Sequence, residues 1–191
     1  MQDIQAKNTI LAPRPLWLAV ALALALGMTG FVPAAHADAS EAAEIAAVAR
    51  AHITPIAAVT LAEKHGGGRA YGMGLEVARL GTWYEVQLDV KGQPMVARID
   101  PHSGALLGIE PARGDDRNGA RTLDGRKIDL TQAIRAAEAH AHGRALEAGP
   151  EGTGASAHYD VDVVGAGGKV QHLSVNADSG AVGAAPRSEW D

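Results

Sequence analysis

The segment ITPIAAVTLAEKHGGGRAYGMGLE, residues 53–76, recurs 75 positions later as IDLTQAIRAAEAHAHGRALEAGPE, residues 128–151. Ten of the 24 aligned pairs are identical, and they include Ile, Glu, His and Arg matches that richness in Ala and Gly does not explain. The same shift aligns Tyr84 with Tyr159. One inserted residue later, Ser103-Gly104-Ala105 aligns with Ser179-Gly180-Ala181. A repeat of this length predicts two copies of one small fold.

Each copy is predicted to begin with a helix. Thr54 is the expected N-cap of the first helix, Pro55 takes the first helical position, and the run Gly66-Gly67-Gly68 ends the helix. In the second copy Asp129 takes the cap position and Gln132 completes a capping box. Strand-like stretches follow at residues 69–78 and, shorter or more irregular, at 144–151.

The clearest strand pattern lies in the hairpin that follows. Apolar Tyr84, Val86 and Leu88 alternate with polar residues, and a turn at Lys91-Gly92 makes Tyr84 face Ile99. In the second copy Tyr159 faces Val175 only if the loop is Ala166-Gly167-Gly168, which is one residue longer. A slip of one residue would turn each apolar set toward water, so the register is well specified.

Both copies resemble PepSY domains. The residues that carry the resemblance are Tyr84-Glu85-Val86 followed by Ile99-Asp100-Pro101-His102-Ser103-Gly104, and Tyr159-Asp160-Val161 followed by Val175-Asn176-Ala177-Asp178-Ser179-Gly180. The resemblance covers about 53–110 and 128–186. It implies an α+β fold of two tandem repeats, each a helix packed on a small antiparallel sheet, and we expect a pseudo-twofold relation between them. Asp100 and Asn176 are expected to form Asx-type turns that end in a glycine with positive φ.

The chain is predicted to be exported. Lys7 and Arg14 precede an apolar run over 16–28, and Ala35-His36-Ala37 is a cleavage site, so 1–37 is interpreted as a signal peptide. An uncleaved anchor is the alternative, although the run is shorter than the ~20 residues that span a bilayer. The expected organisation continues with a short helix at 38–52, a repeat at 53–110, an exposed linker at 111–127, a repeat at 128–186 and a tail at 187–191. The mature protein would be periplasmic or secreted, with no further membrane insertion.

Composition excludes several classes of function. The absence of Cys removes thiol catalysis and thiolate metal sites. After cleavage 15 basic and 21 acidic residues remain, which disfavours nucleic-acid binding. The histidines lack the helical spacing of a zinc site, and no local motif brings Ser, His and Asp together. We therefore predict no enzyme, no metal and no cofactor.

Three side chains on the first hairpin are candidate binding groups. Trp83, Val96 and Arg98 share the outward face of the first hairpin and are the candidate partner-binding residues, since exposed Trp and Arg anchor many interfaces. The simpler interpretation is that Trp83 covers the sheet edge or the junction between the copies. Glu63 and Glu138 recur and are interpreted as the solvated faces of the two helices; the alternatives are a pairing across a pseudo-twofold interface or contact with a partner.

Family resemblance implies the class of function. PepSY units occur in propeptides of secreted metalloproteases, which they are thought to restrain, and no protease follows the repeats here. We therefore expect a non-enzymatic exported module that binds and modulates a secreted or envelope protease, or another protein partner, in trans. The alternative is a ligand- or signal-binding module, with a cleft between the repeats, that acts with a sensor kinase or a transporter.

Overall fold

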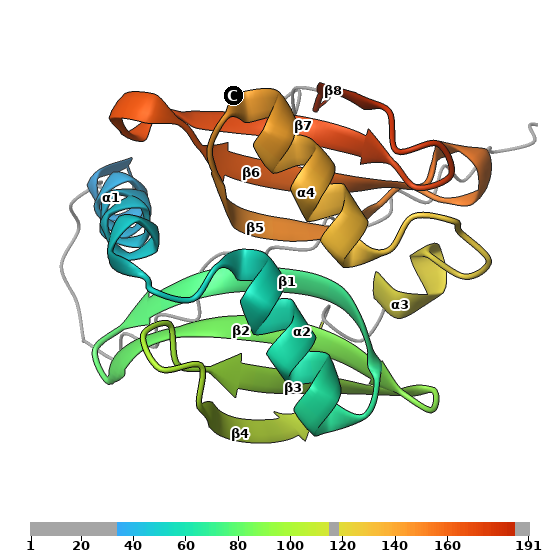
Figure 1. Ribbon diagram of the computed structural model, residues 1–191, viewed down its shortest axis with the longest axis horizontal. Coiled ribbons are helices and arrows are strands. Elements are labelled where there is room, and N and C mark those ends of the chain that lie inside the picture. The colour runs from blue at the N-terminus through green and yellow to red at the C-terminus, as the bar shows by residue number, and fades with distance from the viewer. Residues whose placement is uncertain (1–33, 115–118, 186–191) are drawn as a thin grey trace, which may run out of the picture.

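The computed structural model describes residues 34–114 and 119–185, and side chains from residue 41 onward within those ranges. Most of the predicted signal peptide and the whole 187–191 tail lie outside the described residues. Eight strands form one antiparallel sheet, and α2 and α4 lie across one of its faces (Figure 1). The elements are α1 Ala34–Arg50, α2 Pro55–Gly66, β1 Arg69–Ala78, β2 Gly81–Val90, β3 Gln93–Ile99, β4 Leu106–Pro111, α3 Gly119–Thr122, α4 Leu130–Ala141, β5 Arg144–Glu151, β6 His158–Val164, β7 Val170–Asn176 and β8 Val182–Ala184.

The sheet joins two sets of four strands edge to edge. Its order is β4-β3-β2-β1-β5-β6-β7-β8, so β1 and β5 meet at the centre and β4 and β8 lie at the two ends. The central pair is antiparallel and short, with Met73 opposite Ala148 and Gly74 opposite Glu147. The predicted α+β class with antiparallel strands is confirmed. The two expected small sheets are continuous with each other. In the sequence, strands β1 to β4 come after helix α2, and strands β5 to β8 come after helix α4.

Both hairpin registers agree with the prediction. Tyr84 is opposite Ile99 in the first hairpin, and Tyr159 is opposite Val175 in the second. The Lys91-Gly92 turn has positive φ at both residues, as a two-residue hairpin with a primed turn requires. The second loop contains a 3-10 turn at Ala166–Gly168, closed by a hydrogen bond from Gly165 N to Lys169 O. Alternating apolar residues were sufficient to specify this pairing because a slip of one residue would move Tyr84 and Tyr159 out of the core between sheet and helices.

The predicted helix caps are present. Thr54 Oγ1 accepts a hydrogen bond from Ala57 N at 3.1 Å, and Asp129 forms a complete capping box with Gln132. The C-caps are left-handed in both helices, at Gly67 in the first and at His142 in the second. His142 adopts φ 52° without being a glycine, which costs about 1 kcal/mol or more.

The two helices are tied to their sheets by matching side chains. Glu63 accepts a hydrogen bond from Ala70 N, and Glu138 accepts one from Ala145 N, both at 2.9 Å. Interpreting these glutamates as a solvated face is therefore wrong. The chain reverses directly after each helix, so the first amides of β1 and β5 return to the helix end, where they need an acceptor.

One apolar core lies between the helices and the sheet. Its largest fully buried side chains include Tyr84 and Tyr159. Each tyrosine hydroxyl donates to the backbone before its own helix: Tyr84 to Ile53 O at 3.0 Å and Tyr159 to Ile128 O at 2.9 Å. Burial raises the pKa of both hydroxyls to about 12, which keeps them protonated donors.

Helix α1 joins the two sets of strands. Arg144, from β5, donates to the carbonyl oxygens of Val48, Ala51 and Ile53 at 3.0–3.1 Å. These groups include the orphan carbonyls at the C-terminal end of α1, where a cation is favoured. No single helix among the described residues is long and apolar enough to cross a bilayer. The segments Glu41–Arg50 and Pro55–Gly66 pass that test of length and composition only as a pair, and they are bent by 83°.

The predicted exposed linker, 111–127, is partly structured. Pro111 ends strand β4, α3 occupies Gly119–Thr122, and Leu123 is buried in the core. Ala112 is also buried, and its N–H donates to Pro94 O. The glycine, proline and charged residues of 111–127 predicted an exposed segment, but two apolar residues within it, Ala112 and Leu123, are buried.

Candidate functional site

Arg98 lies at the centre of a cluster on the face of the sheet that α2 and α4 leave uncovered. Its Nε is 3.4 Å from Glu85 Oε2 on β2, and its Nη2 is 2.6 Å from Glu110 Oε1 on β4. The guanidinium carbon stands 5.4 Å from the centroid of the Trp83 ring, within the range of a cation–π contact. These four side chains, which we call the Arg98 cluster, bridge strands β2, β3 and β4.

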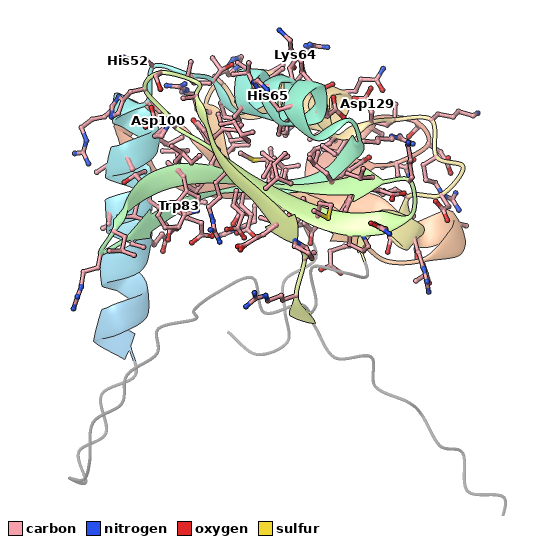
Figure 2. The ribbon with its side chains drawn as sticks, turned by 90° about the horizontal axis from the view of Figure 1, so that it is seen from below. His52, Lys64, His65, Trp83, Asp100 and Asp129 are labelled. Carbon is pink, nitrogen blue, oxygen red and sulfur yellow. The ribbon has the colours of Figure 1, made fainter. Side chains whose placement is uncertain are left out.

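Trp83 lies on the face of the sheet opposite to helices α2 and α4. Figure 2 shows it on the opposite side of the sheet from Lys64 and His65 of α2. Its ring is half-buried, and its Nε1 is enclosed without a hydrogen-bond partner among the described residues. The prediction that Trp83 and Arg98 lie on one face agrees with the geometry, and the two side chains are in contact.

Val96 is less accessible than the sequence suggested. It shares the face of Trp83 and Arg98 but is only 4% exposed. The register places it between Gln87 of β2 and Glu110 of β4. The fourth strand, which was not predicted, supplies the neighbour that covers it.

Strand β4 presents the outer edge of the sheet. It pairs with β3 on one side and has no strand partner on the other within the described residues. Leu106 and Leu107 are 36% and 55% exposed on this strand. A sequence signal was present, since the apolar run Leu106-Leu107 followed by Ile109 comes directly after the turn at Gly104.

Strands β6 and β7 carry acidic and imidazole groups on the uncovered face. His172 Nδ1 is 2.7 Å from Asp162 Oδ1, as the predicted register requires, and His158 Nε2 is 3.2 Å from Asp160 Oδ1. Burial raises the pKa of Asp160, and His158 partly offsets this effect. No group of three or more His, Asp or Glu side chains among the described residues could hold a metal ion.

Both Asx-type turns form as predicted. Asp100 Oδ1 accepts hydrogen bonds from the amides of His102 and Ser103, and Asn176 Oδ1 accepts the equivalent pair from Asp178 and Ser179. The Ser103 amide, with its hydroxyl, lowers the pKa of Asp100. These contacts shape the turns, which confirms the structural interpretation of the motif.

Two hollows stand out among the described residues, one small and one open to solvent. One, of about 50 Å³, is lined by Arg69, Tyr71, Asp89 and Leu123, among others. The other, of about 350 Å³, is open and lies over β6, β7 and β8, next to His158 and Asn176. Drug-sized ligands usually occupy clefts of roughly 300–1,000 Å³ that enclose most of their surface. The larger hollow does not lie between the two sets of strands.

Comparisons with known proteins give a family match for the second half of the chain. Residues 127–182 match the PepSY model, described as "Peptidase propeptide and YPEB domain". The chain is also similar to a "putative lipoprotein" from Clostridium difficile 630 of known crystal structure. That similarity has 16% identity and a TM-score of 0.39, and it covers 69% of this chain and 91% of the other. No curated protein matches the sequence.

Proposed function

Because residues 127–182 carry a PepSY domain, we propose that this chain is a non-enzymatic exported module that binds and modulates a protein partner. The preferred partner is a secreted or envelope protease, since the family is described by its occurrence in peptidase propeptides. We place the module in the periplasm or outside the cell. Another envelope protein would use the same surface.

We further propose that residues 53–110 form a second PepSY-like copy, related to 128–186 by a pseudo-twofold axis. Both segments have the same order of elements, a helix and then four antiparallel strands. They also share the tyrosine-to-carbonyl bond, the glutamate-to-amide bond and the Asx-type turn. The first two contacts recur at a shift of 75 residues and the turn at a shift of 76, after the one-residue insertion in the second hairpin loop, and this regular recurrence supports an origin by duplication.

The open outer edge of β4, next to the Arg98 cluster, is the observation on which the binding proposal rests. An extended segment of a partner can add to such an edge through main-chain hydrogen bonds, and pockets for alternate side chains supply specificity. Leu106 and Leu107 offer apolar contact there. Arg98 and Glu110 offer a polar pair next to the leucines.

Natural proteins usually protect edge strands from unwanted pairing. Here the protection is partial: β4 has six residues, ends at Pro111 and has an irregular register near Arg98. The two exposed leucines leave apolar surface for pairing at the start of the strand. This arrangement suits controlled binding of one partner strand better than open aggregation.

The alternative function, a ligand or signal module that acts with a sensor kinase or transporter, would need an enclosed site. Of the two hollows described above, one is too small for such a ligand and the other is open, which supports the protein-binding proposal over that alternative.

The test is affinity capture with the mature chain as bait in extract from the envelope fraction, followed by a peptidase assay of the eluate. We expect the unmodified chain to capture a protease and change its activity. We expect Leu107→Asp to lose the partner, because a carboxylate at this position would disfavour strand pairing and apolar contact.

The matched control is Leu80→Asp. Leu80 is 93% exposed in the turn between β1 and β2, away from the β4 edge, so this variant adds the same charge and should keep the partner. Capture of no protease, or equal loss with both variants, would contradict the proposal.

A further inference from the structure

Strand β1 has a gap in its row of side chains at the centre of the uncovered face. Gly72 and Gly74 are opposite Gln87 and Glu85 of β2, so they share the face of those polar residues. A Cβ at Gly72 would overlap Gln87 Oε1 and approach Ala148 O of β5. The Gln87 amide therefore lies over β1, in space that only a glycine leaves free.

The carbonyl oxygen of that amide has no donor. Gln87 is 3% exposed, and its Oε1 has no hydrogen-bond partner among the described residues. A buried acceptor without a donor costs about 1–3 kcal/mol. Such a group in a native fold calls for a specific explanation.

Glu147 lies on the other side of the same gap. It is opposite Gly74 on β5, and its Cγ is 4.0 Å from the position that a Cβ on Gly74 would take, with Glu76 Oε1 at 3.8 Å from the same position. Gly72 and Gly74 are two residues apart on one face, a distance of roughly 7 Å, which a glutamine side chain over one and a glutamate side chain over the other can span.

The surroundings of Glu147 oppose a negative charge. Burial raises its pKa to about 8, and like charges on three packed elements add to this: Asp162 on β6, Glu76 on β1 and Glu44 on α1. Asp162 in turn is bonded to His172 of β7. A carboxyl in this state holds its proton at neutral pH and can donate it.

We propose that the carboxyl of Glu147 donates its proton to Oε1 of Gln87 across the glycine gap, and that this hydrogen bond holds together the seam between the two halves of the sheet. The bond matters at the seam because β1 and β5 are matched over only two residue pairs, Met73 with Ala148 and Gly74 with Glu147. Loss of the proton leaves two acceptors facing each other at the point where the halves meet.

The seam is thus a pH-sensitive device. The pKa of Glu147 in the folded protein is about 8, above its usual value of 4.5, so the folded state binds more protons between these values. The stability that Glu147 contributes is therefore fully present below about pH 4.5 and is lost as the pH rises through about 8. Rising external pH loosens the contact between the halves.

Thermal unfolding of the full chain at about pH 5 and about pH 9 tests the device. Glu147→Gln keeps a donor, an amide N–H, at either pH. We expect its Tm to exceed that of the unmodified chain by several degrees at the higher pH, and by much less at the lower pH. Glu41→Gln, at an exposed position on α1, removes a similar charge and should leave the pH dependence unchanged.

A second measurement identifies the acceptor. In a carboxyl NMR titration, Gln87→Leu should lower the pKa of Glu147, because it removes the acceptor that stabilises the protonated form. A rise in that pKa would mean that the Gln87 amide donates to the carboxylate, and would overturn the proposal. So would a pH dependence of Tm that Glu147→Gln leaves unchanged.

Discussion

Two buried tyrosines show how a single residue ties each helix to its hairpin. Tyr84 and Tyr159 reach through the core to carbonyl groups 31 positions earlier in the chain. The two acceptors differ, because Ile53 O also accepts from Arg144. Ile128 O accepts only from Tyr159 among the side chains of the described residues. The tyrosine hydroxyl therefore contributes less to stability in the first half than in the second.

Replacing each tyrosine by phenylalanine tests this difference. We expect Tyr159→Phe to lower the free energy of unfolding by about 2 kcal/mol, because it leaves Ile128 O buried without its side-chain donor. Tyr84→Phe should cost about 1 kcal/mol, since Arg144 still satisfies Ile53 O. Urea denaturation of both variants measures the two losses, and a larger loss for Tyr84→Phe would contradict this account.

The residues of the candidate site could be predicted from the sequence only in part. That Trp83 and Arg98 share one face could be anticipated, because alternation in each strand and the hairpin register place both on the outward face. The exposure of Val96 was not predicted correctly, because its cover comes from β4. The burial of Gln87 was not predicted, because a buried amide has no sequence signature and its alternation in the strand placed it on the solvent side.

The turn that ends each hairpin is the element in which sequence and geometry agree best. Asp100-Pro101-His102-Ser103-Gly104 and Asn176-Ala177-Asp178-Ser179-Gly180 form the same Asx-type turn, closed by Gly104 at φ 74° and Gly180 at φ 72°. The surroundings of the two glycines differ. A Cβ on Gly104 would lie 2.9 Å from Leu61 Cδ1, whereas one on Gly180 would lie 3.4 Å from Ile128 Cδ1.

Alanine at these two positions forms a matched pair. Both variants incur the left-handed strain of about 1–2 kcal/mol. Gly104→Ala should lose roughly 1 kcal/mol more than Gly180→Ala, because Leu61 must also move. Chemical denaturation of the two variants gives this difference directly. Equal losses would show that Leu61 yields at no cost.

At the scale of the whole molecule, two equivalent arginines have different roles. Arg144 holds the end of α1 through three carbonyl groups. Arg69, its counterpart at the shift of 75, is exposed, and its side chain makes no hydrogen bond or ion pair within the described part of the chain. One long helix, α1, therefore connects the halves on one side. On the other side the four-residue α3 contacts the same central strands.

Substitution of each arginine by glutamine tests this asymmetry. Arg144→Gln should lower the free energy of unfolding by about 2–4 kcal/mol and speed amide exchange along α1, since charge-assisted hydrogen bonds are lost. Arg69→Gln should stay within about 0.5 kcal/mol of the unmodified chain, as expected for a surface change. Similar losses for both variants would contradict a special role for Arg144.

The sequence by itself determined the helices, their caps, the two hairpin registers and the closing turns. These features depend on neighbours close in the chain and on the alternation of apolar residues, both of which can be read directly. Only the tertiary structure decided that the strands join into one sheet through β1 and β5, that β4 forms an edge, and that Gln87 and Glu147 share a gap. These features depend on contacts between distant segments, which local patterns do not encode.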